Sequence, residues 1–306
     1  MITLADIGYQ TGWVVIKRLP KKLSRKLFTK IADVSYEKDI KGVQQLRANL
    51  SFMIDLKAES IELEQLVKEG MRSYLRYWED AFRLPTWKKK KLNEYVLCTG
   101  TDNLERALAT KKPLITATPH MGNWDAAGFW YTTNYGPITT VVERLKPESI
   151  YKKFVKFRNS LGIEVIPTSG ETDIFMKLLR RAKEGRMIAL VADRDITKNG
   201  IEVNYGPAKA SFPVGPAAIA VALDGLVLPL SSYYNQEGVL VMNFLPALSP
   251  GLAETKEIKV RNLTQELAHS FEKEIKKHPQ DWHMLQRVWK DVLPMKRINQ
   301  GLVNKF

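Results

Sequence analysis

At residues 113–131 the sequence reads PLITATPHMGNWDAAGFWY. Residues 113–118 are mostly apolar or β-branched, which favours a short buried strand. Proline, glycine and asparagine follow within residues 119–123, so we expect the strand to end in a turn. Residues 124–131 contain no proline and can form a helix. A strand, a turn and a helix in such close succession indicate the start of an alternating α/β pattern.

The same alternation continues after this stretch. Short apolar runs predict strands at 138–142, 163–166, 187–192, 226–230 and 239–244. Apolar residues spaced three or four apart predict helices at 149–161, 172–184, 215–223 and 255–278. This order predicts an α/β fold in which a central, mostly parallel or mixed sheet is flanked by helices. Since sites in such sheets lie at the carboxyl ends of strands, polar residues that follow predicted strands are the first functional candidates.

The residues before this stretch have a different pattern. Apolar and aromatic residues at helical spacing predict helices through most of residues 1–106, and we interpret the aromatic residues at 74–82 as packing. Pro85 ends this pattern, and the run of lysines at 88–91 is expected to be an exposed loop. We therefore predict one domain, 1–306, with a helical N-terminal portion (1–106) and an α/β core (107–306).

The composition is that of a folded globular protein. The chain has 306 residues, 44% of them apolar and 26% charged. No run approaches the ~20 apolar residues of a membrane-spanning helix, and no secretory signal is visible. Cys98 is the single cysteine, so no internal disulfide can form. These features lead us to expect a reducing, cytosolic location.

The charge balance predicts an anionic partner. Lys and Arg outnumber Asp and Glu by 47 to 33, a net charge of +14. The excess is concentrated in residues 1–30, where basic residues alternate with aromatic and aliphatic ones. This pattern suits a helix lying on an anionic membrane surface. It equally suits a terminal helix packed on the domain with a solvated basic face, and the sequence leaves both interpretations open.

His120 and Asp125 are the first candidates for catalysis, because they lie on either side of a glycine-containing turn that follows a predicted strand. An Asp that accepts from one imidazole nitrogen leaves the other free to take a proton from an alcohol. The start of the next helix would offer N–H groups to an oxyanion. The alternative is a structural histidine with a satisfied side chain, which is the more common outcome for a bare pair of this kind.

Two further groups follow predicted strands. Asp193, Arg194 and Asp195 follow the strand at 187–192, where a carboxylate could orient a neighbouring histidine. Glu143 follows the strand at 138–142, and Arg158 lies on the next helix, where it could bind a phosphate. For both groups the alternative is ordinary ion pairing.

Other chemistries have no pattern in this chain. Glycine-rich dinucleotide loops, P-loops and nucleophile elbows are absent from the sequence. With one cysteine and four scattered histidines we expect no metal site and no cofactor. A basic binding module is the remaining alternative, but none of the common nucleic-acid-binding motifs is present, so we expect no nucleic-acid partner.

Taken together, these motifs resemble a known family. His120-Met-Gly-Asn-Trp-Asp125 is similar to the His-x4-Asp motif of the glycerolipid acyltransferase superfamily, in its lysophospholipid and lipid A type. Longer stretches resemble the actinobacterial phosphatidylinositol mannoside acyltransferases, and they run from residue 6 to about 291. These stretches are 77–85, 134–137, 142–149, 158–162, 193–195 and 281–286.

The resemblance implies a reaction and roles for the candidate residues. An acyl group would move from acyl-CoA, as co-substrate, to the 6-hydroxyl of a mannose on phosphatidylinositol mannoside, without a covalent enzyme intermediate. His120 would be the general base and Asp125 would hold the active-site turn. Asp193 matches a position that is commonly Glu in the family. This difference from the family leaves open which of Asp193, Asp195 and Asp125 orients the imidazole of His120.

The resemblance also implies which residues bind substrate and where in the cell the protein acts. Glu143 and Arg158 match the family's pocket carboxylate and arginine, and Arg194 and Asp195 are expected to contact substrate as well. Residues 129–131 and the helix at 215–223 are expected to form walls of an acyl groove. The protein would be peripheral on the inner face of the plasma membrane. The nearest alternative is a lipid A type enzyme that uses acyl carrier protein.

Overall fold

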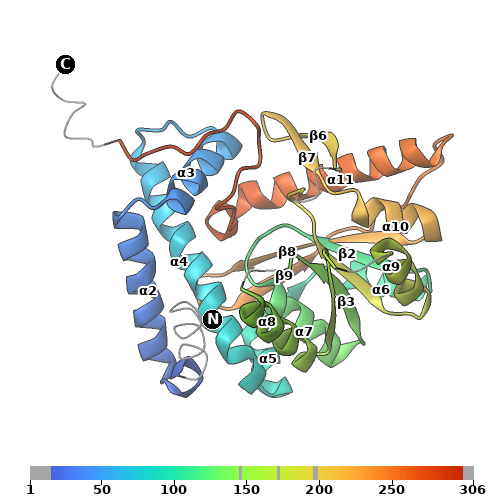
Figure 1. The fold of residues 1–306 in the computed structure, drawn as a ribbon, viewed down its shortest axis with the longest axis horizontal. Helices are drawn as coiled ribbons and strands as arrows, with labels where there is room; N and C mark the ends of the chain where they lie inside the picture. The colour runs from blue at the N-terminus through green and yellow to red at the C-terminus, as the bar shows by residue number, and fades with distance from the viewer. Residues whose placement is uncertain (1–14, 145–146, 171–172, 196–198, 299–306) are drawn as a thin grey trace.

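The computed structural model describes residues 15–144, 147–170, 173–195 and 199–298. Its main sheet has the order β1-β9-β8-β2-β5-β3-β4 (Figure 1). Neighbouring strands are parallel except β8 and β9, so the sheet is mixed, as the sequence predicts. A separate antiparallel hairpin is formed by β6 and β7. The strands are β1 (Val96–Thr99), β2 (Leu114–Thr118), β3 (Ile138–Val142), β4 (Ile163–Pro167), β5 (Met187–Val191), β6 (Ile201–Tyr205), β7 (Ala208–Phe212), β8 (Leu226–Tyr234) and β9 (Leu240–Phe244).

Helices cover both faces of this sheet and form a layer at one end. Their bounds are α2 (Lys21–Glu37), α3 (Lys41–Ile54), α4 (Ile61–Arg83), α5 (Lys89–Tyr95), α6 (Thr101–Ala109), α7 (Trp124–Asn134), α8 (Glu148–Ser160), α9 (Ile174–Lys183), α10 (Gly215–Leu223) and α11 (Lys256–Lys277). Two short 3-10 turns are η1 (Leu84–Thr86) and η2 (Pro279–Asp281). Apart from β6 and β7, the strand–helix order from β2 onward matches the sequence prediction.

Two apolar cores hold these layers together. One lies between the sheet and α9, α10 and α11, and it continues into α3 and α4. The other lies on the opposite face, where α6, α7 and α8 pack. Because β2 is buried along its whole length, the loop that follows it is fixed between the two cores.

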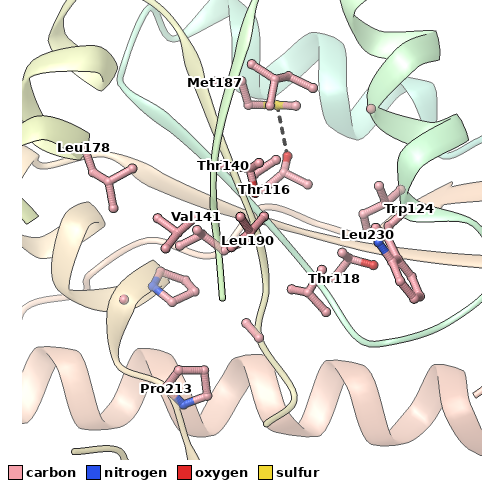
Figure 2. A pocket seen from close by; sticks show the side chains of 18 of the residues that line it. Thr116, Thr118, Trp124, Thr140, Val141, Leu178, Met187, Leu190, Pro213 and Leu230 are labelled. Atoms are coloured by element: carbon pink, nitrogen blue, oxygen red, sulfur yellow. Dashed lines mark hydrogen bonds between the residues drawn. The ribbon is translucent and has the colours of Figure 1, made fainter. Parts of the chain in front are cut away.

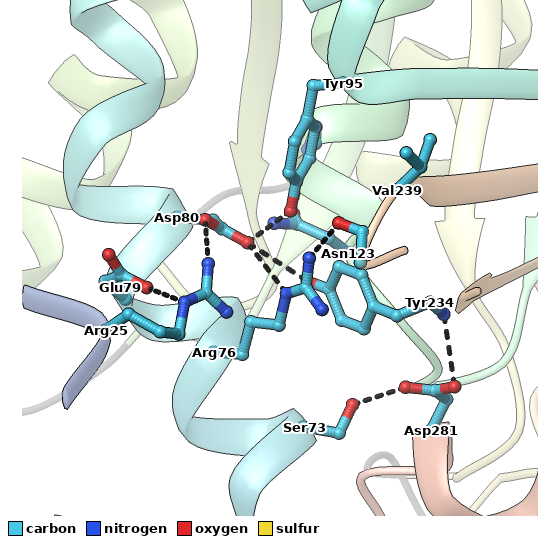
Figure 3. Close-up of polar contacts among 12 residues, drawn as sticks. Arg25, Ser73, Arg76, Glu79, Asp80, Tyr95, Asn123, Tyr234, Val239 and Asp281 are labelled. Atoms are coloured by element: carbon cyan, nitrogen blue, oxygen red, sulfur yellow. Dashed lines mark hydrogen bonds and ion pairs between the residues drawn. The ribbon is translucent and has the colours of Figure 1, made fainter. Parts of the chain in front are cut away.

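The N-terminal helices are joined by buried charges as well as by apolar packing. Helix α2 turns Phe28 and Ala32 toward α4. Arg25 of α2 pairs with Glu79 at 2.6 Å and with Asp80 at 3.1 Å (Figure 3). Both carboxylates are almost fully buried, so these pairs are shielded from solvent on the side of α4. In Figure 1, α2 and α4 lie side by side at the edge of the molecule farthest from α10.

Three local expectations are corrected by the structure. Residues 96–99 form β1, the edge strand, rather than helix, because their backbone pairs with β9. Residues 89–91 are the first turn of α5 rather than a loop, although all four lysines are exposed as expected. The β6–β7 hairpin was not predicted. The domain boundaries stay a prediction, and residues 1–14 of the predicted basic start lie outside the described residues.

Within the described ranges, no helix combines the length and apolar character needed to cross a bilayer.

Candidate active site

His120 lies in the loop between β2 and α7, at the carboxyl end of the central strand. Asn123 caps α7 with its side-chain oxygen, which accepts from the N–H of Ala126 at 2.9 Å. Gly122 has a φ of +59°, and a Cβ there would lie 2.3 Å from the carbonyl oxygen of Ser232. The glycine and the asparagine of the motif therefore set the path of the loop, and the loop presents His120.

Asp193 is the carboxylate that contacts His120. Its Oδ1 lies 2.5 Å from Nδ1 of the imidazole, and its Oδ2 accepts from the backbone N–H of His120 at 2.9 Å. Asp193 follows β5, which pairs with β2, so two neighbouring strand ends bring the residues together. The His120 side chain is 32% exposed and the Asp193 side chain is not exposed at all.

The electrostatics of this pair fix its hydrogen bonding. Burial alone would raise the pKa of Asp193, but the positive charge available on His120 lowers it. Hydrogen bonds from the imidazole, the Trp282 indole and the His120 backbone lower it further, and the pKa lies below its usual value. An ionised Asp193 accepts from Nδ1–H, and the lone pair of the imidazole is then on Nε2.

Asp125 has other partners. Its Oδ1 accepts from Nε of Arg158 at 2.7 Å, and its Oδ2 accepts from the hydroxyl of Tyr77 at 2.7 Å. The expectation that Asp125 accepts from the His120 ring is therefore wrong in this structure. The reason is geometric: Asp125 lies in the first turn of helix α7 and binds residues of α8 and α4, whereas the end of β5 lies beside the imidazole.

This second carboxylate joins three helices. Asp125 of α7, Arg158 of α8 and Tyr77 of α4 meet in a buried cluster. Burial, and then the charge of Asp125, raises the pKa of the Tyr77 hydroxyl well above its usual value. Burial would lower the pKa of the Arg158 guanidinium, but Asp125 raises it. Both groups are thus held in their ordinary charge states, a cationic guanidinium and a neutral phenol.

A cavity of about 610 Å³ opens beside His120. Its lining is mostly apolar and comes from β2, β3, β5, α7, α9 and α10. In Figure 2, Thr118 and Trp124 lie at one end of the view and Leu178 at the other. Glu143, Arg158 and Arg194 also line the cavity, so the structure brings three of the predicted substrate-binding residues to the same space as His120.

The rim of this cavity carries a loose ion pair. Arg194 approaches Glu143 at 3.9 Å, and the Glu143 side chain is 60% exposed. An ion pair of this length and exposure contributes little to stability, so both groups are available to a ligand.

Two expectations about the cavity are only half correct. Tyr131 and helix α10 supply lining residues, whereas Phe129 and Trp130 are not among them. Asp195 is also not in the lining. Its Oδ2 accepts from the Gly200 N–H at 2.8 Å and from the Ser211 hydroxyl at 3.1 Å, which connects it to the β6–β7 hairpin.

The N–H groups of the loop are already hydrogen-bonded within the protein. Those of residues 120, 121 and 122 donate to Asp193, Pro119 and Asp281, and that of Asn123 donates to the Ser232 hydroxyl. The expected oxyanion donors are therefore not these four groups. The remaining N–H groups of the first turn of α7 are the next candidates.

Sequence reasoning missed Trp282. Its Nε1–H donates to Oδ2 of Asp193 at 2.9 Å, and the indole is fully buried. The neighbouring residues form a chain in which Ser73 bridges Asp281 and His283, with Oγ 2.9 Å from Nε2 of His283. The signal lies in the motif at 281–286, which contributes to the family resemblance.

Metal ligation has no obvious place in this arrangement. Across the described residues no group of three or more His, Cys, Asp or Glu side chains is placed to hold an ion. What the site offers is a buried carboxylate, an imidazole whose ring borders a cavity, and an apolar space. This set of groups can remove a proton from a bound hydroxyl.

The chain matches known proteins along most of its length. Residues 4–291 match the family model described as bacterial lipid A biosynthesis acyltransferase. The chain is 37% identical, over 94% of its length and 91% of the relative's, to a phosphatidylinositol mannoside acyltransferase of Mycolicibacterium smegmatis. It is 38% identical, over 94% of its length and 89% of the relative's, to one of Mycobacterium tuberculosis.

A solved structure is also similar. The crystal structure of a 1-acyl-sn-glycerophosphate acyltransferase of Thermotoga maritima aligns with a TM-score of 0.39 and 11% identity, over 83% of this chain and 98% of that one.

Proposed function

The chain belongs to the bacterial lipid A biosynthesis acyltransferase family, and from this premise we propose that it transfers a long-chain acyl group from acyl-CoA to the 6-hydroxyl of a mannose of phosphatidylinositol mannoside. The acceptor is proposed because both mycobacterial relatives carry the name phosphatidylinositol mannoside acyltransferase. The long acyl chain, similar to palmitoyl, is proposed because the cavity beside His120 is mostly apolar.

In this reaction His120 is the general base. Nε2 takes the proton of the mannose hydroxyl while its oxygen attacks the thioester carbonyl carbon. The tetrahedral intermediate collapses, the carbon–sulfur bond breaks, and the CoA thiolate takes the proton back from the imidazolium. The acyl group passes directly to the acceptor, so no bond to the enzyme forms. Asp193 holds the imidazole with Nδ1–H directed to its carboxylate and stabilises the imidazolium while it exists.

One observation carries this proposal. The Nδ1 side of His120 is bound to a buried, ionised carboxylate, while the ring borders a cavity of about 610 Å³. Such volumes are typical of pockets that bury small ligands. The alternative interpretation of the motif is a purely structural histidine. That interpretation does not explain why the ring borders an apolar cavity of this size.

Glu143, Arg158 and Arg194 are proposed to act on the polar parts of the two substrates. Arg194 and Glu143 lie at the cavity rim, where hydroxyl and phosphate groups could replace their weak mutual contact. Arg158 is engaged with Asp125, so its proposed contribution is to shape the wall beside the reacting groups.

We also propose a peripheral location on the inner face of the plasma membrane, with α2 on the lipid. Leu23, Leu27 and Ile31 form an exposed apolar row on α2, with 53%, 43% and 41% exposure. Lys22, Lys26 and Lys30 are exposed one position before each of them. An apolar row beside a basic row is the pattern of a helix that lies among anionic headgroups.

The membrane proposal is tested by sedimentation with vesicles of anionic phospholipid. Replacing Lys22, Lys26 and Lys30 by Gln should weaken binding, by roughly 1 kcal/mol per lysine removed. The matched control replaces Lys256, Lys273 and Lys276, three exposed lysines of α11, by Gln and should leave binding nearly unchanged. Equal losses in both variants would mean that net charge, rather than α2, sets the affinity.

The reaction is tested by incubating the protein with palmitoyl-CoA and phosphatidylinositol dimannoside and reading the product by mass spectrometry. A product heavier by one acyl chain is expected. His120→Ala should lower its formation by at least ~10²-fold, the smaller of the usual contributions of a general base. His269→Ala, which removes an exposed histidine of α11, is the control and should retain full activity.

The outcomes separate donor, acceptor and base. If CoA thiol is released in a His120-dependent reaction but no acylated glycolipid forms, the role of His120 is supported and the proposed acceptor is rejected. Normal transfer by His120→Ala would reject the central assignment.

A lipid A type acceptor is the second candidate, and the description of the matching family favours it. In this second candidate we propose acyl carrier protein as the donor. The donors are compared in the same assay. Transfer from acyl carrier protein alone would replace the CoA assignment and leave the role of His120 intact.

A further inference from the structure

Trp282 reaches the candidate active site from the segment that follows α11. This segment turns back through η2 and then runs antiparallel to the His120 loop, with a single bridge between Met121 and Trp282. The N–H of His283 donates to the carbonyl of His120 at 2.7 Å, and the N–H of Gly122 donates to the carbonyl of Asp281 at 2.9 Å. The backbone on both sides of the indole is therefore hydrogen-bonded to the loop that carries His120.

The indole donates to the carboxylate that holds His120. Oδ2 of Asp193 accepts two hydrogen bonds of 2.9 Å, one from Trp282 Nε1 and one from the backbone N–H of His120. Oδ1 faces Nδ1 of the imidazole at 2.5 Å. Two donors on one oxygen fix the rotation of the carboxylate plane, and the other oxygen is then directed to the imidazole.

We propose that Trp282 is a positioning residue for the acyl transfer proposed above: it fixes Asp193 so that Asp193 can fix His120. This inference rests on the proposed function. Trp282 does not line the cavity, so it acts on the reaction only through Asp193.

A second buried tryptophan shows what a purely structural indole looks like here. Trp289 is 2% exposed, and its ring centroid lies 6.2 Å from that of Trp282. Its Nε1–H donates at 3.0 Å to the backbone carbonyl of Tyr205, a neutral acceptor. A hydrogen bond to an ionised acceptor is stronger than one to a neutral acceptor, so the same substitution at the two positions removes different interactions.

Two titratable groups packed against the pair, His283 and Tyr205, do not change charge near neutral pH. Burial lowers the pKa of His283 to about 3. Burial, and then the charge of Asp193, raises the pKa of Tyr205 well above its usual value. Asp281 lies next to Trp282, and burial raises its pKa to about 6. The acidic limb of the pH–rate profile is therefore compared in an Asp281→Asn background, where it reports the His120–Asp193 pair.

The test compares Trp282→Phe with Trp289→Phe in the full chain, using the acyl-transfer assay over a range of pH. Trp282→Phe should lower kcat by about 10- to 100-fold with little change in KM for the acyl donor, as expected when a group that orients a functional imidazole is lost. Its acidic limb should move to higher pH. Without the indole the carboxylate carries more of its charge toward the imidazole and holds the proton of the imidazolium more tightly. Trp289→Phe should keep the kcat and the pH profile of the unaltered protein.

Three results are distinguishable. Equal effects of the two substitutions on kcat and on the acidic limb would show that Trp282 only fills space, and would overturn the inference. Loss of thermal stability in both variants, with the kinetic effects confined to Trp282→Phe, would support it. Retention of full activity by His120→Ala would reject the proposed function itself, whatever the tryptophan variants do.

Discussion

The carboxylate in the first turn of α7 and the carboxylate that follows β5 are both buried beside the same cavity, but they bind different groups. Asp125 accepts from a guanidinium and a phenol, Arg158 and Tyr77, which come from two other helices. Asp193 accepts from the ring and backbone of His120 and from Trp282. Asp125 is five residues from His120 in the sequence and Asp193 is 73 residues away.

This difference separates a carboxylate that joins helices from one that sets a proton's position. An Asp whose donors are Arg158 and Tyr77 anchors α4, α7 and α8 to one another, and its loss should be seen in stability. An Asp whose donor is an imidazole facing a cavity controls the tautomer, and its loss should be seen in turnover. Replacing each Asp by Asn tests whether the two carboxylates differ in this way.

The largest effect is expected from Asp193→Asn. Two N–H donors hold the oxygen at the Oδ2 position, so the amide NH2 must face Nδ1 of His120. The imidazole is then forced into the tautomer with its proton on Nε2, and it cannot accept a proton from the acceptor hydroxyl. We expect kcat to fall on the order of 10⁴-fold, measured in the acyl-transfer assay, while circular dichroism shows a folded protein. Turnover within tenfold of normal would contradict the assignment of Asp193.

Asp125→Asn should act mainly on stability. It leaves the buried guanidinium of Arg158 without a full counter-charge, and breaking a pair of this kind costs about 3–5 kcal/mol. Unfolding in urea measures the loss. The double variant Asp125→Asn/Arg158→Met should recover part of it, because no buried charge is then unpaired. A normal free energy of unfolding for Asp125→Asn would mean that the pair does not anchor the helices.

A third buried carboxylate, Asp281, extends the comparison to pH. It accepts from the Ser73 hydroxyl and from the backbone N–H of Tyr234 (Figure 3), and no cation is hydrogen-bonded to it among the described residues. Burial raises its pKa to about 6. Because the folded protein then binds this proton more tightly than the unfolded chain does, the group stabilises the fold at low pH. That stabilisation is lost as the pH rises from about 4 through about 6.

The expected size of this effect is about 2 kcal/mol between roughly pH 4.5 and pH 7.5. It is measured as the difference in unfolding free energy between the unaltered protein and Asp281→Asn at the two pH values, which cancels the titration of the other groups. A difference that does not change with pH would show that Asp281 titrates as an ordinary exposed carboxyl.

The three carboxylates also show how far the sequence could go. The strand–helix order from β2 onward follows from local apolar patterns, and so does the placement of His120, Glu143 and Asp193 at strand ends. The partner of His120 depends on which strands are neighbours in the sheet. No local sequence pattern predicts that β2 lies between β8 and β5. The role of Trp282 is even harder to predict from local sequence, because its hydrogen bond to Asp193 depends on how the chain turns back after α11.

The missed elements have the same cause. Residues 96–99 lie among helical patterns and become a strand only because β9 offers an unpaired edge. The lysines at 88–91 are exposed in either a loop or a helix, so their charge could not decide between the two.

The smallest effect is expected from Asp195→Asn, the matched control for Asp193→Asn two residues away. Asp195 accepts from the Gly200 N–H and the Ser211 hydroxyl through one oxygen, and the amide oxygen of Asn can accept from both. The change should therefore keep both of these hydrogen bonds, and it should leave kcat unchanged because the side chain does not line the cavity. If Asp195→Asn instead reduced turnover as Asp193→Asn does, the whole turn after β5 would be responsible. The contact between Asp193 and His120 would then no longer explain the loss.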